Sequence, residues 1–277
     1  MINELNYQSV MVRELPVEHS FHKDVVVYRC GTLIKGEVFT WAYFYELGNI
    51  LFDSGCPNTA RETVEEVGNM VTVLITHHHE DHIGAAPLLS RTAKIYAPRK
   101  SIELLRNPPE IPDYRKIVWG QPESFKPLPV PDRLEINGLT IEVLETPGHS
   151  FDHVTYLVGD IAFVGDLVNR PRQIVSLKGE NMVETIHSLE KLLSYDIKWA
   201  YGGTGVYNRA EVEEYLEYLV DLKDRAEHLY NRGMGIEEIA GKLFPNPSRK
   251  AILFEQYSGG EWSRINLVKS LLGVCDE

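Results

Sequence analysis

Apolar residues along the chain follow two patterns, one typical of strands and one typical of helices. Short runs rich in β-branched and aromatic residues, separated by turn residues, predict strands over most of the chain before residue 202. The predicted strands are residues 24–28, 38–47, 50–52, 71–75, 94–97, 133–136, 139–144, 154–158, 161–164 and 197–201. Apolar residues at helical spacing predict helices over 59–67, 83–89 and 181–193. Residues 71–75 are apolar almost throughout, as expected for a strand buried on both faces.

The last quarter of the chain shows helical spacing only. One apolar stripe extends along a long helix that ends near Gly233, and two shorter helices are predicted over residues 236–243 and 262–272. We therefore expect a main domain over residues 1–208 and a small helical appendage over residues 209–277.

Seven prolines lie between residues 107 and 132. Proline fixes φ and lacks an N–H group, so this density predicts an extended connection without a regular helix. Connections of this length in compact domains often form lids over an active site, although some are plain insertions. The sequence leaves both interpretations open.

A group of metal-binding side chains follows the predicted strand 71–75, where the chain reads THHHEDH. In an extended turn, His77 and His79 can share one face. Asp81 and His82 can reach a second position from the start of a helix. Imidazole and carboxylate together suit zinc, iron or manganese, and the lack of cysteine nearby disfavours a structural zinc site. Burying these groups without a cation is costly, because they lose water and repel one another. The alternative is a solvated polar loop.

Two later turns repeat this arrangement. His149 lies in a Pro-Gly-His-Ser turn after the predicted strand 139–144, and Asp166 follows Gly165 after the predicted strand 161–164. Glycine lets the backbone bend sharply at each turn. Three such turns after three strands predict that the side chains converge on one cation.

The motifs HxHxDH, Pro-Gly-His and Gly-Asp, taken in this order and spacing, resemble the signature of the metallo-β-lactamase superfamily. The resemblance extends from about residue 25 to residue 205, and it includes the LFDSG element that contains Asp53. It implies an α/β fold, the four-layer αββα sandwich, with a metal site at one edge of the two sheets. The C-terminal helices resemble the winged-helix-like tail of glyoxalase-II-like and β-lactamase-like endoribonuclease relatives.

The resemblance also implies roles for individual residues. The metal ligands would be His77, His79 and His149 for one ion, Asp81 and His82 for a second, and Asp166 as a bridge. Asp53 would support these ligands without binding metal. Zinc is the expected metal, with iron or manganese as alternatives. The metal would lower the pKa of water to about 7. Asp81 is the expected catalytic residue, because it can orient the resulting hydroxide or relay its proton.

One position departs from the family pattern. Most dinuclear members complete the second site with a histidine in a Pro-Gly-His-Gly turn, whereas this chain reads GGTG and places Thr204 there. Threonine is a poor zinc ligand, so one ion and two ions both stay open. His153 and His187 are candidate substitutes. His153 could instead contact substrate or support a ligand, and His187 fits an amphipathic helix.

Charge narrows the substrate class. Lys and Arg total 28 against 40 Asp and Glu, which gives a formal net charge of −12. A chain with this negative charge repels polyanions, so the charge disfavours a nucleic-acid substrate. We expect a metal-dependent hydrolase that uses a metal-activated hydroxide on a small ester, thioester, lactone or phosphoester. The alternatives are a mononuclear iron oxygenase resembling persulfide dioxygenases, which Thr204 favours, an endoribonuclease, and a metal-free binding protein.

No apolar run is long enough to span a bilayer, and the first residues lack the basic-then-apolar layout of a signal peptide. Cys30, Cys56 and Cys275 are odd in number and widely separated, which disfavours a disulfide framework. We therefore expect a cytoplasmic protein without membrane contact. The sequence carries no signal for the oligomeric state.

Overall fold

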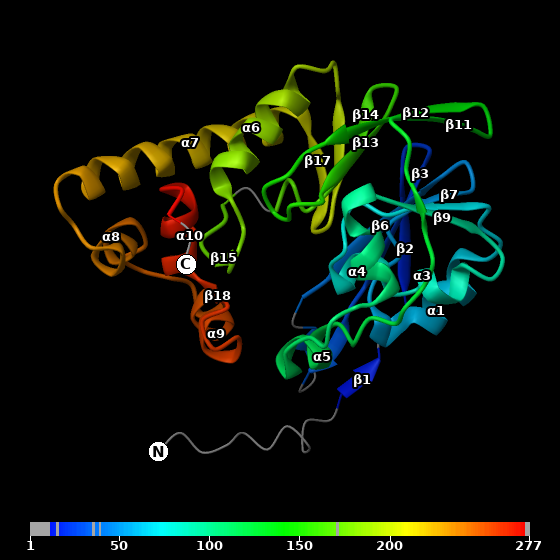
Figure 1. Ribbon diagram of the computed structural model, residues 1–277, viewed down its shortest axis with the longest axis horizontal. Helices are drawn as coiled ribbons and strands as arrows, with labels where there is room; N and C mark the ends of the chain where they lie inside the picture. The colour runs from blue at the N-terminus through cyan, green and yellow to red at the C-terminus, as the bar shows by residue number, and fades with distance from the viewer. Residues whose placement is uncertain (1–11, 15–16, 35–36, 39, 170–171, 275–277) are drawn as a thin grey trace. The chain divides into compact units, whose positions relative to one another are not determined.

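The computed structural model describes residues 12–14, 17–34, 37–38, 40–169 and 172–274 (Figure 1). The chain forms two compact units. The first unit contains the chain up to Ala97 together with Ser101–Pro129, and the second contains Pro98–Lys100 together with the chain from Val130 onward. Each unit combines one large β-sheet with helices.

The first unit is built around a seven-stranded mixed sheet. Its strands in spatial order are β10 (Leu128–Pro129), β9 (Lys94–Ala97), β8 (Thr72–Leu74), β7 (Ile50–Phe52), β6 (Ala42–Leu47), β3 (Val25–Cys30) and β2 (Glu18–His22). Val73 in β8 is fully buried and pairs with Leu51 in β7 and Ile95 in β9, which confirms a central strand within residues 71–75. β7, β8 and β9 are parallel, so their carboxyl ends lie at one edge of the sheet.

A smaller sheet in the first unit contains β1 (Val12–Glu14), β4 (Thr32–Ile34) and β5 (Glu37–Val38). The sequence predicted one strand over residues 38–47. The structure divides it between β5 and β6, because residues 40–41 belong to no strand.

The helical elements of the first unit are short. They are η2 (Pro57–Thr59), α1 (Ala60–Val67), α2 (Glu80–Ile83), α3 (Ala86–Leu89), α4 (Ile102–Arg106) and α5 (Asp113–Val118), and η3 (Arg99–Ser101) spans the junction with the second unit. The predicted helix 83–89 is interrupted at Gly84, whose N–H donates to the Gly55 carbonyl oxygen. A Cβ on Gly84 would lie 2.0 Å from the carbonyl carbon of Cys56, so the chain needs glycine at this break.

The proline-rich segment 107–132 contains α5, so the prediction of no helix there is wrong. No proline occurs between Pro112 and Pro122, and Pro112 precedes the first helical residue, where a missing N–H is tolerated. Arg115 in α5 forms a two-pronged ion pair with Glu80 in α2, with N–O distances of 2.6 and 2.7 Å. This contact fixes the segment to α2 and favours a fixed wall over a hinged lid.

The second unit contains a six-stranded sheet. Its strands in spatial order are β11 (Arg133–Ile136), β12 (Leu139–Glu145), β13 (Val154–Val158), β14 (Ile161–Gly165), β16 (Trp199–Gly202) and β17 (Gly205–Asn208). β11 and β12 form the predicted hairpin, with positive φ at Asn137 (52°) and Gly138 (80°) as a tight turn requires. Residue 201 was predicted to end the last strand, which is wrong because β17 returns antiparallel to β16.

The helices of the second unit are α6 (Met182–Leu193), α7 (Arg209–Asn231), α8 (Ile236–Leu243), α9 (Arg249–Tyr257) and α10 (Arg264–Leu271), and β15 (Ser176–Leu177) pairs with β18 (Trp262–Ser263) (Figure 1). The three predicted C-terminal helices correspond to α7, α8 and α10, whereas α9 was missed. One hydrophobic core joins Leu189 of α6, Ala200 of β16, Tyr215 of α7 and Leu267 of α10. The boundary predicted between residues 208 and 209 falls at the start of α7, inside this unit.

None of the described helices is both long enough and apolar enough to cross a membrane. Cys30 and Cys56 are buried free thiols. Cys275 lies outside the described residues.

Candidate metal centre

Asp53 organises the potential ligands of the first unit. It follows β7 in a left-handed conformation, with φ of 63°, and its N–H donates to the Leu74 carbonyl oxygen of β8 at 2.9 Å. Its side chain is buried and accepts hydrogen bonds from the Thr76 N–H (2.7 Å) and the Thr76 hydroxyl (2.8 Å). His82 Nδ1 lies 2.7 Å from Asp53 Oδ2, the oxygen that also accepts from the Thr76 hydroxyl. One carboxylate therefore connects the ends of β7, β8 and α2.

These bonds define which ring nitrogens can bind a metal. His82 donates its Nδ1–H to Asp53, so the neutral ring carries its lone pair on Nε2. The hydroxyl of Thr76 gives its proton to Asp53 and therefore accepts from Nδ1 of His77, 3.0 Å away. His77 is thus held with its lone pair on Nε2 as well. Thr76 was not singled out from the sequence, because nothing in its pattern marks a hydroxyl that connects a carboxylate to a histidine.

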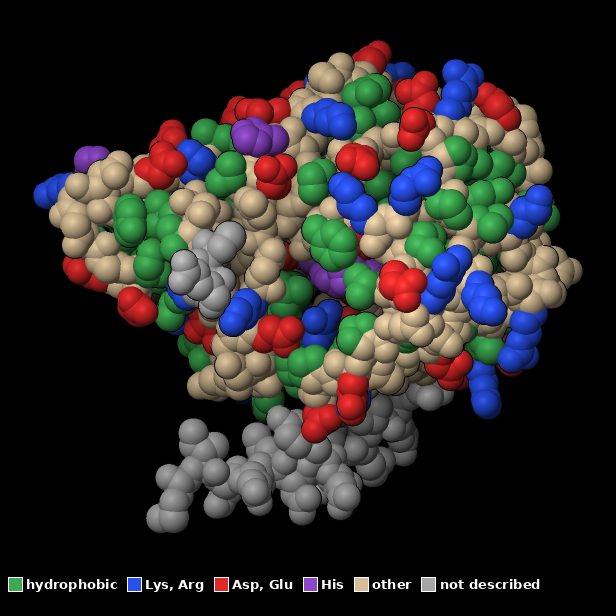
Figure 2. Space-filling model, viewed as in Figure 1, with side chains coloured by type: hydrophobic (Ala, Val, Ile, Leu, Met, Phe, Trp, Pro, Cys, Tyr) green, Lys and Arg blue, Asp and Glu red, His purple; other side chains and the backbone are tan. Residues whose placement is uncertain are grey.

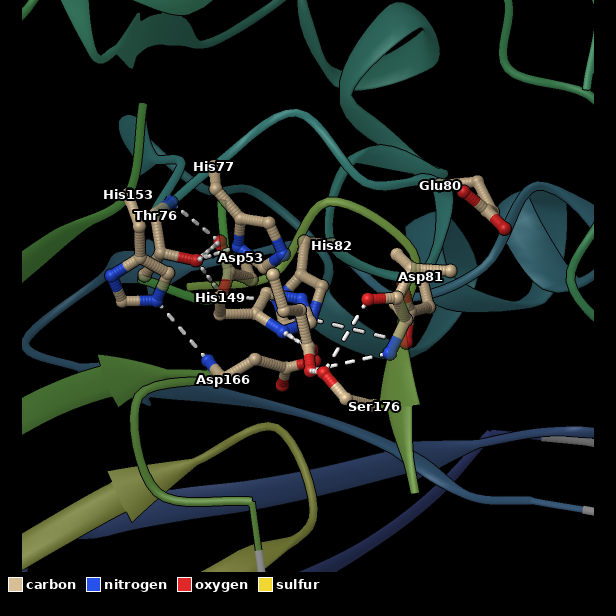
Figure 3. Close-up of polar contacts among 12 residues, drawn as sticks. Asp53, Thr76, His77, Glu80, Asp81, His82, His149, His153, Asp166 and Ser176 are labelled. Carbon is tan, nitrogen blue, oxygen red and sulfur yellow. Dashed lines mark hydrogen bonds and ion pairs between the residues drawn. The ribbon is translucent and has the colours of Figure 1, made fainter. Parts of the chain in front are cut away.

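The histidines of the HxHxDH motif lie together (Figure 3). The ring centre of His77 is 4.6 Å from that of His79 and 4.2 Å from that of His82. Ring nitrogens of His77 come within 4.8 Å of a ring nitrogen of each neighbour. Asp81 Oδ2 lies 3.9 Å from His82 Nε2. These residues could hold a cation, as the sequence predicts, and imidazole binds a metal in its neutral form.

Glu80 points away from this cluster (Figure 3). Its carboxylate is buried and forms an ion pair with Arg115. His78 stacks edge-on against His79, with ring centres 4.8 Å apart.

In the second unit, His149 and Asp166 lie side by side. His149 follows β12 and Asp166 follows β14, and His149 Nε2 is 3.3 Å from Asp166 Oδ2. Two ligands with bonds of about 2.1 Å to one tetrahedral ion are separated by roughly 3.4 Å. The pair is therefore spaced as two ligands of one ion would be.

The turn that presents His149 needs glycine before it. Gly148 has a φ of 142°, and a Cβ there would lie 2.2 Å from Thr185 Oγ1 of α6. The turn therefore packs its backbone directly on α6, and the Asn181 N–H donates to the Gly148 carbonyl oxygen at 2.7 Å. This contact explains the Pro-Gly-His pattern in physical terms.

Glu180 contacts Nδ1 of His149 in the same way that Asp53 contacts Nδ1 of His82. Its Oε1 lies 2.5 Å from His149 Nδ1, and the side chains of both residues are buried. The carboxylate therefore holds His149 with its lone pair on Nε2, the atom that faces Asp166. Sequence analysis missed Glu180, because the contact joins residues 31 positions apart and no local motif surrounds it.

Residues 36–223 match the model of the Metallo-beta-lactamase superfamily, which is more than half of the chain. The chain belongs to the metallo-β-lactamase superfamily. The predicted family is therefore confirmed, and so is the predicted fold class, with mixed sheets, accompanying helices and helices at the C-terminus.

Two named members of the superfamily match part of the chain. The hydroxyacylglutathione hydrolase of Xylella fastidiosa is 39 % identical over 97 residues, which cover 34 % of this chain and 31 % of that protein. The atrochrysone carboxyl ACP thioesterase of Aspergillus fumigatus is 29 % identical over 158 residues, which cover 56 % of this chain and 44 % of that protein. The matches thus span about a third of the first relative and less than half of the second.

Among solved structures, the chain resembles an archaeal metallo-β-lactamase superfamily protein from Sulfolobus tokodaii. The TM-score is 0.54 at 18 % sequence identity, and the alignment covers 76 % of this chain and 86 % of that one. At this identity the likeness concerns the fold alone.

His153, a candidate for a replacement ligand, lies behind Asp166 within the metallo-β-lactamase fold. Its Nδ1 is 2.9 Å from Thr146 Oγ1, and its Nε2 accepts the Asp166 N–H at 3.2 Å (Figure 3). The ring is 1 % exposed. These contacts fit a residue that supports Asp166, and they do not fit a replacement metal ligand. His187, the other candidate, is exposed on α6.

Thr204 lies in the turn between β16 and β17, where the superfamily pattern has a histidine. Its hydroxyl is 2.7 Å from the hydroxyl of Tyr207. The turn thus holds a pair of hydroxyl groups, which are weaker zinc ligands than imidazole.

Proposed function

We propose that this chain is a zinc-dependent hydrolase of small acyl thioesters. The observation that carries the proposal is the orientation of three histidines: buried Asp53 and Glu180 hold His77, His82 and His149 with Nε2 ready to bind metal. Superfamily membership supports metal-dependent hydrolysis. The names of both curated relatives support a thioester substrate. One is named as a hydrolase of hydroxyacylglutathione, and the other as a thioesterase of an acyl carrier protein.

The proposed ligands are four histidines and two aspartates. We assign His77, His79 and His149 to one ion, Asp81 and His82 to a second, and Asp166 to both. The donor set contains nitrogen and oxygen only, which suits zinc in a catalytic site, with iron or manganese as alternatives. Thr204 leaves the second ion short of a strong ligand, so we propose one tightly held ion and a second that is weakly held.

A divalent ion held by these residues would lower the pKa of a bound water and polarise the thioester carbonyl. Asp81 is the proposed catalytic residue, because its Oδ2 can accept the proton of the attacking water. Asp53, Thr76 and Glu180 keep the imidazoles in one tautomer and one orientation. His153 holds the backbone of Asp166.

The leaving group also favours a thioester. A thiol has a pKa near 8.5 and departs as a thiolate without help, whereas an alkoxide needs a proton donor. Asp81 and Asp166 are carboxylates, which suit the removal of a proton from water better than protonation of a leaving group.

The net charge of −12 disfavours an endoribonuclease, because it repels a polyanion. On the face shown in Figure 2, acidic side chains are interspersed with basic ones. We therefore propose a small-molecule substrate and, with Cys30 and Cys56 as free thiols, a location in the cytoplasm.

The second candidate is a mononuclear iron oxygenase resembling persulfide dioxygenases. Thr204 favours it, because a threonine in the GGTG turn weakens the second metal position. Iron in the purified protein together with oxygen consumption on a persulfide would select this candidate. A metal-free binding protein is disfavoured, because buried carboxylates orient three imidazoles of the family's ligand set.

The decisive assay measures turnover of the zinc-loaded chain on an acyl thioester, a lactone and a phosphodiester. We expect the thioester to give the highest kcat/KM. His79→Ala should reduce thioester turnover at least about a hundredfold, because a ligand is lost. His187→Ala, at an exposed position on α6, is the control and should leave turnover unchanged. Full activity in His79→Ala, or a preference for the phosphodiester, would contradict the proposal.

A further inference from the structure

Glu180 is the centre of a buried hydrogen-bond network in the second unit. Its Oε1 contacts His149 Nδ1 at 2.5 Å. Its Oε2 accepts from the Ser176 hydroxyl (2.5 Å), the Leu177 N–H (3.2 Å) and the Gln173 side-chain amide (3.1 Å). One carboxylate oxygen thus accepts a hydrogen bond from His149, and the other accepts hydrogen bonds from three donors.

The network continues from Gln173 to the long helix α7. Gln173 Oε1 accepts from the Tyr215 hydroxyl at 2.7 Å, and its backbone carbonyl oxygen accepts from the Tyr218 hydroxyl at 2.7 Å. Tyr215 is 1 % exposed, and burial raises the pKa of its phenol well above the usual value, so the hydroxyl keeps its proton and remains a donor. Two tyrosines of α7 therefore hold Gln173, one at its side-chain amide oxygen and one at its backbone carbonyl oxygen.

The last helix, α10, holds the backbone on the other side of Glu180. The Ser270 hydroxyl donates to the Glu180 carbonyl oxygen at 2.7 Å and accepts the Met182 N–H at 2.6 Å. Next to this contact, β15 pairs with β18, which immediately precedes α10. The segment that contains Glu180 is thus held by β18 and α10, which belong to the last quarter of the chain.

We infer that Glu180 is a positioning residue for the metal ligand His149. We infer further that α7 and α10 contribute to the metal centre by holding Glu180 in place. This inference rests on the proposed function. A carboxylate on Nδ1 fixes the tautomer and raises the basicity of Nε2, and removing such a partner typically weakens metal binding about 10- to 100-fold. The C-terminal helices therefore act on the chemistry through the chain Tyr215, Gln173, Glu180 and His149.

A structural role alone would leave metal affinity unchanged once the protein is folded. Glu180→Gln keeps the size of the side chain, but an amide cannot accept from His149 on one side and from three donors on the other. Tyr215→Phe removes one hydroxyl at the far end of the network and keeps the packing. Glu190→Gln, at an exposed position on α6, makes the same chemical change away from the network and is the matched control.

The test is a competition for Zn²⁺ between the full chain and a chromophoric chelator, with the absorption spectrum of the Co²⁺-loaded protein as a second readout. We expect Glu180→Gln to bind Zn²⁺ about 10- to 100-fold more weakly and to shift the Co²⁺ spectrum. Tyr215→Phe should lose less than about tenfold in the same direction, because it acts through two intervening residues. Glu190→Gln should match the original chain.

Unchanged Zn²⁺ affinity and an unchanged Co²⁺ spectrum in Glu180→Gln would overturn the inference. If Glu180→Gln does not fold, Tyr215→Phe decides in its place, and wild-type affinity there would overturn the inference equally. The proposed function fails differently. A chain that binds Zn²⁺ tightly and weakens on Glu180→Gln, yet hydrolyses no thioester, would contradict the function and leave the role of Glu180 intact.

Discussion

Two buried carboxylates, Asp53 and Glu180, orient the histidines of this protein. Each accepts a hydrogen bond from Nδ1 of a proposed ligand, and each is fixed by further donors from the neighbouring backbone or side chains. Asp53 does so from a left-handed conformation, with φ of 63°, that most side chains avoid. Backbone strain of this kind costs on the order of 1 kcal/mol and persists where the surroundings impose it.

Asp53→Asn separates the charge of this residue from its backbone conformation. Asparagine tolerates the left-handed region as aspartate does, so the fold should be retained. Its amide group offers one acceptor where the carboxylate offers two, so His82 or Thr76 loses its partner. We expect Zn²⁺ affinity to fall about 10- to 100-fold by chelator competition.

Asp24→Asn, in the exposed turn between β2 and β3, is the control and should bind Zn²⁺ as the original chain does. Equal affinities in the two variants would show that Asp53 does not orient the ligands.

At the residue scale, local patterns mark the proposed ligands, whereas most of the residues that support them carry no such pattern. His77, His149 and Asp166 each follow a strand in a recognisable turn, so a local pattern reveals them. Thr76 and Glu180 act through contacts that only the folded chain brings together. Asp53 was found because it belongs to a family motif.

At the scale of elements, the ion pair between Arg115 and Glu80 joins α5 to α2. The two side chains are 12 % and 2 % exposed, so the pair is largely removed from water. Breaking one partner of such a pair leaves a buried carboxylate without compensation. The pair therefore holds the proline-rich segment against the helix that contains Asp81 and His82.

Arg115→Ala should lower the free energy of unfolding by about 3 kcal/mol, because Glu80 is left buried and unpaired. Urea unfolding followed by circular dichroism measures the change. Lys116→Ala is the matched control on the same helix, since its partners Glu110 and Asp113 are exposed, and it should change the free energy of unfolding far less. A loss for Arg115→Ala no larger than that of the control would contradict the proposed anchoring.

Elements with strong local patterns were predicted and elements set by packing were not. β8 follows from a buried apolar run, and α7 follows from an apolar stripe at helical spacing. The break at Gly84 depends on the backbone of Cys56, which no local pattern reports. α5 was missed because the proline count was read over the whole segment, although residues 113–121 contain none.

At the scale of the whole molecule, the core of the second unit includes the C-terminal helices. Val212, Leu243 and Leu267 pack in the same cluster as Leu189 and Ala200. The sequence predicted these helices as an appendage, because helical periodicity alone does not show which core a helix shares. Their contact with the Glu180 segment gives them a part in the proposed chemistry.

We propose that a catalytic metal ion is bound by His77, His79, His82, His149, Asp81 and Asp166. The most direct test is the metal content of the full chain, purified without chelators and measured by elemental mass spectrometry. The account predicts at least about one zinc, iron or manganese ion per chain, lost when the protein is dialysed against a strong chelator. Protein that contains no stoichiometric metal and takes up none on addition of Zn²⁺ would contradict it.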